Sequence, residues 1–170
     1  MSVDSIPGQA LPTENQGTVT AHDLRSVMGH WTTGVCVVTT EVSGRQAGLV
    51  MNSFASVSLD PALVSWCVDR SSTNFGTWLE TDNFSVHILD QARSHHVPRF
   101  TRRGADKFEG LKTTTGTTGA PALTDVAARL DCRIWARYDG GDHIILVGEV
   151  DHIARPQAFE PLLSQDLRRP

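Results

Sequence analysis

The segment from Gly48 to Asp69 carries small hydrogen-bonding side chains inside a sequence that otherwise favours buried β-strand. Its two ends are apolar, whereas its middle holds Asn52, Ser53, Ser56 and Ser58. Such side chains either satisfy neighbouring backbone groups or act as donors and acceptors for a bound ligand. The segment is therefore a candidate binding surface, and both alternatives remain open on the sequence alone.

A second candidate site is the polar run that follows this segment. Ser71, Ser72 and Thr73 precede a predicted short helix that runs through Trp78 and Leu79. Backbone N–H groups at a helix start, together with the helix dipole, form a natural cradle for a phosphate. Ser71 or Ser72 would also cap the helix, and the two roles are compatible.

The histidines and cysteines do not predict a metal site. His95 and His96 are adjacent, and adjacent residues on a helix point in different directions, so we expect a solvated face there. The sequence has no CxxC pair and no Cys/His spacing suited to zinc. The three cysteines lie in apolar, strand-like runs and are expected to be buried, reduced thiols: Cys36, Cys67 and Cys132.

Composition and charge exclude several classes of partner. The chain has 170 residues, of which 39% are hydrophobic and 20% charged, as in a soluble globular protein. Its formal net charge of −4 provides no overall basic field, and Arg102 and Arg103 form only a small cluster, so we expect no nucleic-acid partner. No apolar run approaches the ~18 residues of a membrane helix, and residues 1–17 lack the pattern of a secretory signal. We therefore expect no membrane partner and a cytoplasmic location.

The elements that must position these residues are mostly strands. Residues 1–19 are rich in Gly, Pro and polar side chains and predict a flexible tail, with residues 20–170 as one domain. A helix capped by Thr20 follows, and its apolar face consists of Leu24, Val27, Met28 and Trp31.

Strand patterns then recur along most of the chain. They cover Gly34–Thr40, two stretches of Gly48–Asp69 separated at Leu59–Pro61, Phe84–Leu89, the alternating run Leu130–Tyr138, and His143–Ile153 after a DGGD turn. Gln91–Phe100 has weak helical character interrupted by Pro98, and Thr113–Pro121 reads as a loop. Six or seven strands joined by turns, with three short helices, predict a mainly β protein whose antiparallel sheet closes into a barrel.

Several motifs for common chemistries are absent. The sequence has no GxGxxG after a strand, no phosphate-binding GxxxxGK[ST] loop and no GxSxG nucleophile turn. Dinucleotide binding by a Rossmann fold is therefore not indicated.

Six short runs occur in the order in which a known family carries them. They are TTGVCVVTT, GLVMNSFASVSLDPALV, DRSST, DKFEG, GAPAL and DGGDHIILVGEV. Together they resemble the flavin reductase-like family, which has the FMN-binding split-barrel fold, and more narrowly the short-chain reductase component of two-component flavin-dependent monooxygenases. The resemblance implies a homodimer of split β-barrels that uses NADH or NADPH to reduce flavin. The reduced flavin would then reach a partner monooxygenase by diffusion.

The resemblance also assigns roles to particular residues. An isoalloxazine ring is flat and mostly apolar with one polar edge, so its site needs apolar walls and a few fixed donors and acceptors. Thr33, Gly34 and Val35 would lie along the ring, and Asn52, Ser53 and Phe54 would contact its edge and face. The remaining implied contacts are Val57 and Ser58 near the ribityl chain or phosphate, Ser71, Ser72 and Thr73 at a phosphate, and Phe108 over the cofactor.

His143, in the run GGDHI, is the candidate catalytic residue. The resemblance places it beside the flavin, on the side that the nicotinamide approaches. Hydride transfer from nicotinamide C4 to flavin N5 requires stacking and close approach rather than a strong acid or base, so we assign His143 a positioning role. The alternative is a histidine that only hydrogen-bonds its own turn.

The sequence departs from the family pattern at one informative place. Many relatives carry Thr where this chain has Val50, and Met51 is bulkier than usual. FAD is favoured over FMN, and NADH over NADPH, but neither choice is fixed. Competing interpretations are a flavin- or haem-binding carrier or sensor without turnover, an oxidase acting on pyridoxamine phosphate, and a purely structural module.

Overall fold

The computed structural model describes residues 17–103, 106–155 and 158–168. Contacts within the chain divide it into two units, one ending at Trp31 and one beginning at Thr32. The predicted tail of residues 1–19 lies almost wholly outside the described residues, so the tail and its boundary stay predictions.

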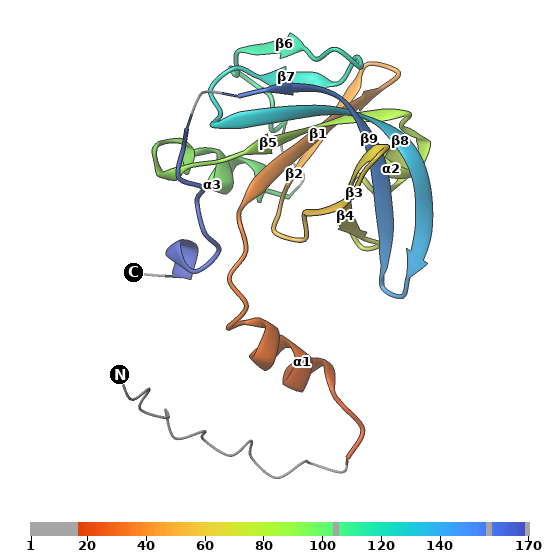
Figure 1. The fold of residues 1–170 in the computed structure, drawn as a ribbon, viewed down its shortest axis with the longest axis vertical. Helices are drawn as coiled ribbons and strands as arrows, with labels where there is room; N and C mark the ends of the chain where they lie inside the picture. Colours follow the sequence, from red (N-terminus) through yellow and green to blue (C-terminus); the bar gives the residue numbers. More distant parts are fainter. Residues whose placement is uncertain (1–16, 104–105, 156–157, 169–170) are drawn as a thin grey trace, which may run out of the picture. The chain divides into compact units, whose positions relative to one another are not determined.

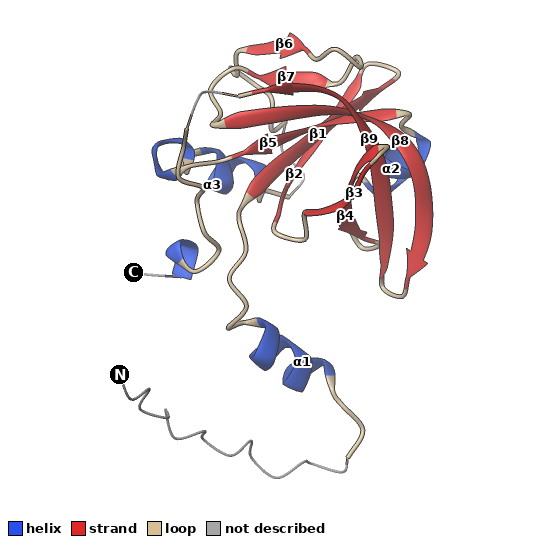
Figure 2. Cartoon of the chain, in the orientation of Figure 1, coloured by secondary structure: helices blue, strands red, loops and turns tan. Residues whose placement is uncertain are grey.

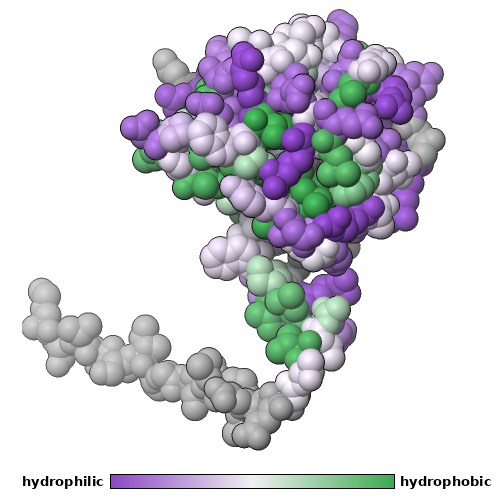
Figure 3. Space-filling view, turned by 90° about the vertical axis from the view of Figure 1, so that its right-hand side faces the viewer, coloured by the Kyte–Doolittle hydropathy of each residue, from purple (hydrophilic) through white to green (hydrophobic). Residues whose placement is uncertain are grey.

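The first unit contains helix α1 (Ala21–Met28), which begins as predicted. The Thr20 side chain accepts a hydrogen bond from the backbone N–H of Asp23, and the Asp23 carboxylate accepts one from the backbone N–H of Thr20. This reciprocal capping satisfies two N–H groups that a helix start leaves unpaired. The large apolar side chains of the unit are exposed: Leu24, Val27, Met28 and Trp31. Figure 3 shows green, apolar side chains gathered over α1.

Seven strands of the second unit form one sheet, drawn in red in Figure 2. Their order across the sheet is β2-β1-β5-β8-β9-β4-β3, and every neighbouring pair is antiparallel. The strands are β1 (Cys36–Val42), β2 (Arg45–Met51), β3 (Ala55–Leu59), β4 (Ala62–Asp69), β5 (Asn83–Ile88), β8 (Ala128–Gly140) and β9 (His143–Ala154).

The two edges of this sheet, β2 and β3, are consecutive in the sequence. Only residues 52–54 join them, and so short a connection spans at most about 14 Å. The sheet must therefore curl until its edges approach each other, which produces the partly closed barrel of Figure 1. The predicted mainly β, antiparallel split barrel is confirmed.

Large aromatic residues fill the inside of the curled sheet. Trp66 is fully buried and packs edge-on against Trp78 and Phe84, with ring centroids 5.0 and 5.8 Å apart. A Cβ atom at Gly148 would lie 2.4 Å from the Phe84 ring, so β9 needs a glycine where this ring meets it. Aromatic pairs in this geometry contribute about 0.5–1.5 kcal/mol beyond their buried area.

Several smaller elements differ from the sequence-based predictions. The predicted loop Thr113–Pro121 contains a hairpin, β6 (Thr113–Thr115) and β7 (Pro121–Leu123), which brings the described strands to nine. Gln91–Phe100 forms a 3₁₀ turn (Gln91–Arg93) and helix α3 (His96–Phe100), and Pro98 lies in the first turn of α3, where proline is tolerated. A second 3₁₀ turn (Asp166–Arg168) lies near the C-terminus.

All three cysteines are free, as predicted. Cys36 and Cys132 are buried, and burial raises the pKa of each thiol to about 12. Cys67 is only partly buried.

The alternation predicted for Leu130–Tyr138 fails near both ends of the run, since Tyr138 of the apolar set is 54% exposed and Asp131 of the polar set is buried. Asp131 should face outward but is fully buried, because the register with β9 shifts between Asp131 and Cys132. Its carboxylate accepts hydrogen bonds from Ser85 Oγ at 2.8 Å and from the Thr117 backbone N–H at 3.0 Å, and it pairs with Arg129 at 3.0 Å.

Within the described part of the chain, no helix has both the length and the apolar character needed to cross a bilayer.

Candidate functional site

A cavity of about 710 Å³ opens on the second unit. Its lining comes from β2 and the turn before it, the end of β4, the turn that precedes helix α2 (Phe75–Glu80), and the segment that follows α3. Elements distant in the sequence thus meet around one hollow.

One wall of the cavity is apolar and tightly packed. Phe100 and Phe108 meet edge-on with centroids 5.4 Å apart. A Cβ atom at Gly48 would lie 2.5 Å from the Phe100 ring, so only glycine allows β2 to approach this pair. The Lys107 ammonium donates to the carbonyl oxygens of Gly48 and Phe100, each at 2.8 Å, and partial burial lowers its pKa. Leu49 and Val50 extend this wall.

The opposite side is polar and begins at the end of β4. The Asp69 carboxylate accepts a hydrogen bond from the Ser71 backbone N–H at 2.7 Å, and the Asp69 carbonyl accepts one from the Ser72 N–H at 2.9 Å. Hydrogen bonding with Ser71 lowers the pKa of Asp69, and electrostatic interactions with nearby His143 and Arg103 lower it by a smaller amount. Ser71, Ser72 and Thr73 line the cavity.

The predicted helix start is wrong by several residues. Helix α2 begins at Phe75 after Asn74, and neither Ser71 nor Ser72 caps it. Two backbone N–H groups of the serine turn are already bonded to Asp69, so the serines cannot act through a helix start as predicted. Contact of Ser71, Ser72 or Thr73 with a phosphate stays a prediction and would rest mainly on their hydroxyls.

Three arginines that the sequence analysis did not assign to the site line the same cavity. Arg45 forms an exposed ion pair with Glu80 at 3.6 Å. Neither Arg102 nor Arg103 makes a hydrogen bond or ion pair within the described residues, although Arg103 lies close enough to Asp69 to lower its pKa. The RR pair just before DKFEG was the only sequence signal for them.

The predicted contacts of the Gly48–Asp69 segment lie outside this lining. Ser53 Oγ accepts a hydrogen bond from the Cys67 N–H at 3.0 Å, and Ser58 Oγ accepts one from the Asp60 N–H at 3.3 Å. These two hydroxyls therefore do satisfy neighbouring backbone groups. Asn52 and Ser53 are exposed where β2 passes to β3. The flavin-contacting roles stay predictions for Asn52, Ser53, Phe54, Val57 and Ser58.

Thr33, Gly34 and Val35 lie against the C-terminal segment. The Val35 N–H donates to the Leu162 carbonyl at 2.9 Å, and the Ser164 N–H donates to the Thr33 carbonyl at 2.8 Å. The Val35 side chain is buried in a core cluster, while Gly34 is exposed. Their contact with a flavin ring is likewise still a prediction.

His143 opens β9 beside the cavity without lining it. It pairs across the sheet with Asp69, which does line the cavity. Its Nδ1 lies 2.7 Å from the Asp142 carboxylate, so the ring is oriented by its own turn. A position next to Asp69 is compatible with contact to a ligand that extends from the cavity, and the positioning role of His143 stays a prediction.

The residues present fit a flavin. The apolar wall suits the ring, the hydroxyls of Ser71–Thr73 offer hydrogen bonds, and Arg102 and Arg103, which have no ion-pair partner in the described part of the chain, match a phosphate. When bound, flavin supplies the hydride acceptor, and the chain's own residues bind and orient it.

Comparison with known proteins decides the family. The flavin reductase like domain matches residues 28–169. This chain belongs to the flavin reductase-like family.

Similar proteins are consistent with that assignment. The chain is 40% identical over 134 residues to the FMN reductase (NADH) SmoA of Agrobacterium fabrum, covering 79% of this chain and 76% of that protein. It is 34% identical over 140 residues to HsaB of Rhodococcus jostii, the reductase subunit of a flavin-dependent monooxygenase, covering 82% and 72%. The structure of the NADH:FAD oxidoreductase SgcE6 of Streptomyces globisporus, in complex with NAD and FAD fragments, is 36% identical, with a TM-score of 0.77 and coverage of 84% and 86%.

The predicted NAD(P)H-dependent flavin reductase is thereby confirmed at the level of enzyme class.

Proposed function

We propose that this protein reduces free FAD with NADH and supplies the reduced flavin to a partner flavin-dependent monooxygenase. FMN and NADPH are the alternative substrates. The observation that carries the proposal is the cavity itself, which joins an apolar wall to two arginines without ion-pair partners among the described residues. A ligand that combines a flat ring with phosphate groups complements both.

Each part of the cavity has its own task in this proposal. Phe100 and Phe108 bound the ring and exclude water from it, Ser71 and Ser72 hydrogen-bond the chain that carries the phosphate, and the arginines neutralise its charge. Arginine suits this last task because its planar fork binds phosphate oxygens in pairs.

His143 orients the nicotinamide in this proposal. Replacing it by Ala should raise the KM for NADH more than the Kd for flavin, because the residue stands beside the cavity and not in its lining. Steady-state kinetics and flavin fluorescence titration measure the two constants separately. Normal turnover and normal NADH saturation in the His143→Ala variant would show that this histidine only hydrogen-bonds its own turn.

The test of the whole proposal is NADH and NADPH oxidation by the purified protein with FAD, FMN and riboflavin added in turn. Turnover that requires added flavin is expected, with the highest kcat/KM for FAD and NADH. Flavin binding without oxidation of either nucleotide would favour the flavin carrier or sensor instead.

The partner and the assembly are proposed on different grounds. HsaB is a reductase subunit by name, and we propose the same place for this chain in a two-component monooxygenase.

We also propose a homodimer, because β3 and β8 expose large apolar side chains that a second copy would cover: Val57, Leu59, Trp135 and Tyr138. Sedimentation equilibrium should give twice the 18.5 kDa chain mass.

A further inference from the structure

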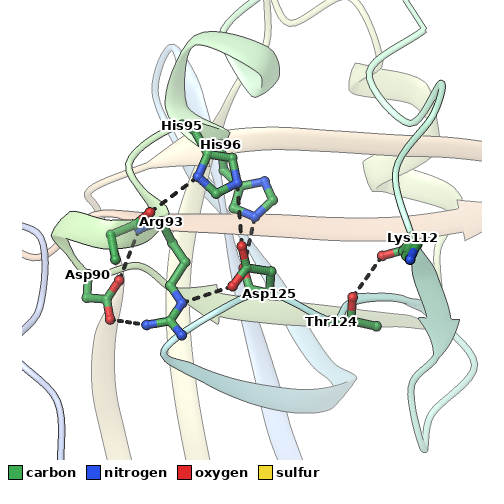
Figure 4. Close-up of polar contacts among 8 residues, drawn as sticks. Asp90, Arg93, His95, His96, Lys112, Thr124 and Asp125 are labelled. Carbon is green, nitrogen blue, oxygen red and sulfur yellow. Dashed lines mark hydrogen bonds and ion pairs between the residues drawn. The ribbon is translucent and has the colours of Figure 1, made fainter.

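His95, His96 and Asp125 converge at the start of α3, and none of the three lines the cavity. One nitrogen from each imidazole and one carboxylate oxygen of Asp125 all lie within 4.8 Å of one another. Among the described residues, this is the one place where three or more His, Cys, Asp or Glu side chains approach so closely. Figure 4 shows both rings directed toward Asp125.

The geometry differs from the sequence-based expectation. His95 is the N-cap residue of α3 and has helical backbone angles, yet its ring lies beside that of His96. Their ring centroids are 4.3 Å apart. The expected solvated face is also wrong for His96, which is buried with a relative exposure of 3%.

The hydrogen bonds leave the nitrogen lone pairs available. His95 Nδ1 lies 3.4 Å from the Ala92 carbonyl, which can only accept, so Nδ1 carries the hydrogen and Nε2 has a free lone pair. That Nε2 faces Asp125 Oδ2 at 3.7 Å. Such a carbonyl partner on the far nitrogen is the usual support of a metal-binding histidine.

His96 supplies a second, independent observation. Its Nε2 donates to the Asp125 backbone carbonyl at 2.9 Å, so its Nδ1 carries the lone pair. This Nδ1 is buried and has no hydrogen-bond partner among the described residues.

The carboxylate is oriented by a third group. Arg93 Nε donates to Asp125 Oδ1 at 3.1 Å, and the other side of Arg93 pairs with Asp90. Asp125 therefore keeps Oδ2 for His95, while Asp90 offsets the charge of Arg93. The side chains of His95 and Asp125 are 56% and 61% exposed, so an ion can enter from solvent.

We propose that His95, His96 and Asp125 bind a divalent transition-metal ion of the zinc type. Two imidazole nitrogens and one carboxylate oxygen form a ligand set that zinc uses, with water in the fourth position. Tetrahedral zinc brings neighbouring ligand atoms to roughly 3.3 Å, so ligand atoms that now lie up to 4.8 Å apart close in by at most about 1.5 Å on binding.

The bound ion links two parts of the fold. Asp125 follows β7, whereas the histidines begin α3, whose last residue, Phe100, lines the cavity. The site does not depend on the flavin chemistry, so its success or failure is separate from that of the proposed function.

The experiment uses the full-length, untagged protein after treatment with a chelator and desalting. Isothermal titration calorimetry with zinc chloride should show one ion bound per chain. Cobalt(II) should give the visible absorption of a low-symmetry N/O site without thiolate charge-transfer bands. His95→Gln and Asp125→Asn should each weaken zinc binding at least about tenfold, since each removes a ligand atom. His22→Gln, at an exposed histidine of α1, should leave it unchanged.

Arg93→Gln separates a ligand role of Asp125 from a structural one. This variant removes the same ion pair as Asp125→Asn but keeps the carboxylate, so it should retain zinc. The proposal is overturned by the lack of stoichiometric binding, by binding that His95→Gln leaves intact, by a thiolate spectrum, or by equal loss in Arg93→Gln and Asp125→Asn.

Discussion

The cavity and the buried polar cluster around Asp131 use charge in opposite ways. At Asp131 the charged group is fully buried, and all its partners come from the same chain: Ser85, Thr117 and Arg129. At the cavity, Arg102 and Arg103 lie open and find no hydrogen-bonding partner within the described residues. A charged side chain that is paired within the protein stabilises the fold, whereas a charged side chain without a partner at the cavity is available to bind a ligand.

His87 belongs with the internally matched group. It is fully buried, its Nδ1 donates to the Val37 carbonyl at 3.1 Å, and its Nε2 accepts from the Leu123 N–H at 3.0 Å. The ring thus joins β5 to β1 and β7 while remaining neutral, because burial lowers its pKa to about 3.

The largest effect should come from breaking the buried cluster. Asp131→Ala leaves Arg129, whose side chain is only 18% exposed, without its partner and should lower the free energy of unfolding by about 3–5 kcal/mol. Urea unfolding measures this change. Asp151→Ala, which removes the partner of the exposed Arg133, is the matched control and should cost about 1 kcal/mol or less. Equal losses of unfolding free energy in the two variants would show that the buried cluster around Asp131 contributes no more to the fold than an exposed ion pair.

The next effect concerns ligand affinity instead of stability. Replacing Arg102 and Arg103 together by Ala should raise the KM for FAD and FMN about 10- to 100-fold, the value of one or two charge-assisted hydrogen bonds. Riboflavin has no phosphate, so its KM should not change. Arg133→Ala, at an arginine outside the cavity lining, should leave all three values alone. A parallel loss for riboflavin would mean that the arginines support the fold.

A smaller effect should appear as pH dependence. The pKa of His87 is about 3 in the folded protein, below its usual 6.5, so the unfolded chain binds a proton that the folded chain excludes. Stability should therefore fall as pH decreases from about 6.5 toward 3, with this residue contributing at most about 1.4 kcal/mol per pH unit. Urea unfolding between pH 4.5 and 7 measures the slope, and His87→Gln should reduce it. An unchanged slope in that variant would assign the acid sensitivity to other groups.

The smallest effect is expected at the exposed rim of the cavity. The Arg45–Glu80 pair is 3.6 Å long and its side chains are 69% and 60% exposed, so Glu80→Gln should change the unfolding free energy by less than about 0.5 kcal/mol. Thermal unfolding measured in parallel with Asp131→Ala makes the contrast direct. A loss above 1 kcal/mol would show that the rim also contributes to the fold.

The fold was largely predictable because its signals are local. The capping residues Thr20 and Asp23 and the turn before His143 depend on neighbours in the sequence, and α1, β8 and β9 lie close to where the pattern indicated. Register is not local: the outward position predicted for Asp131 was lost to a shift in pairing with β9.

The site was predictable only in part. Ser71–Thr73 and Phe108 line the cavity, but Arg102 and Arg103 reach it only because the segment after α3 folds back over β2. No pattern around those arginines encodes that path. The convergence of His95 and His96 escaped for a related reason, since Asp125, which both rings approach, is 29 residues from His96 in the sequence.

The order of strands in the barrel has a consequence for synthesis on the ribosome. Strand β4 pairs with β9, and Leu63 faces Glu149, 86 residues later by subtraction of the two numbers. At roughly 5–20 residues per second, β4 waits about 4–17 seconds for that partner to be translated. During that interval Leu63 and Val64 lack one of their two neighbouring strands, and Trp66 lacks the one strand with which it pairs, so these apolar side chains stay open to aggregation.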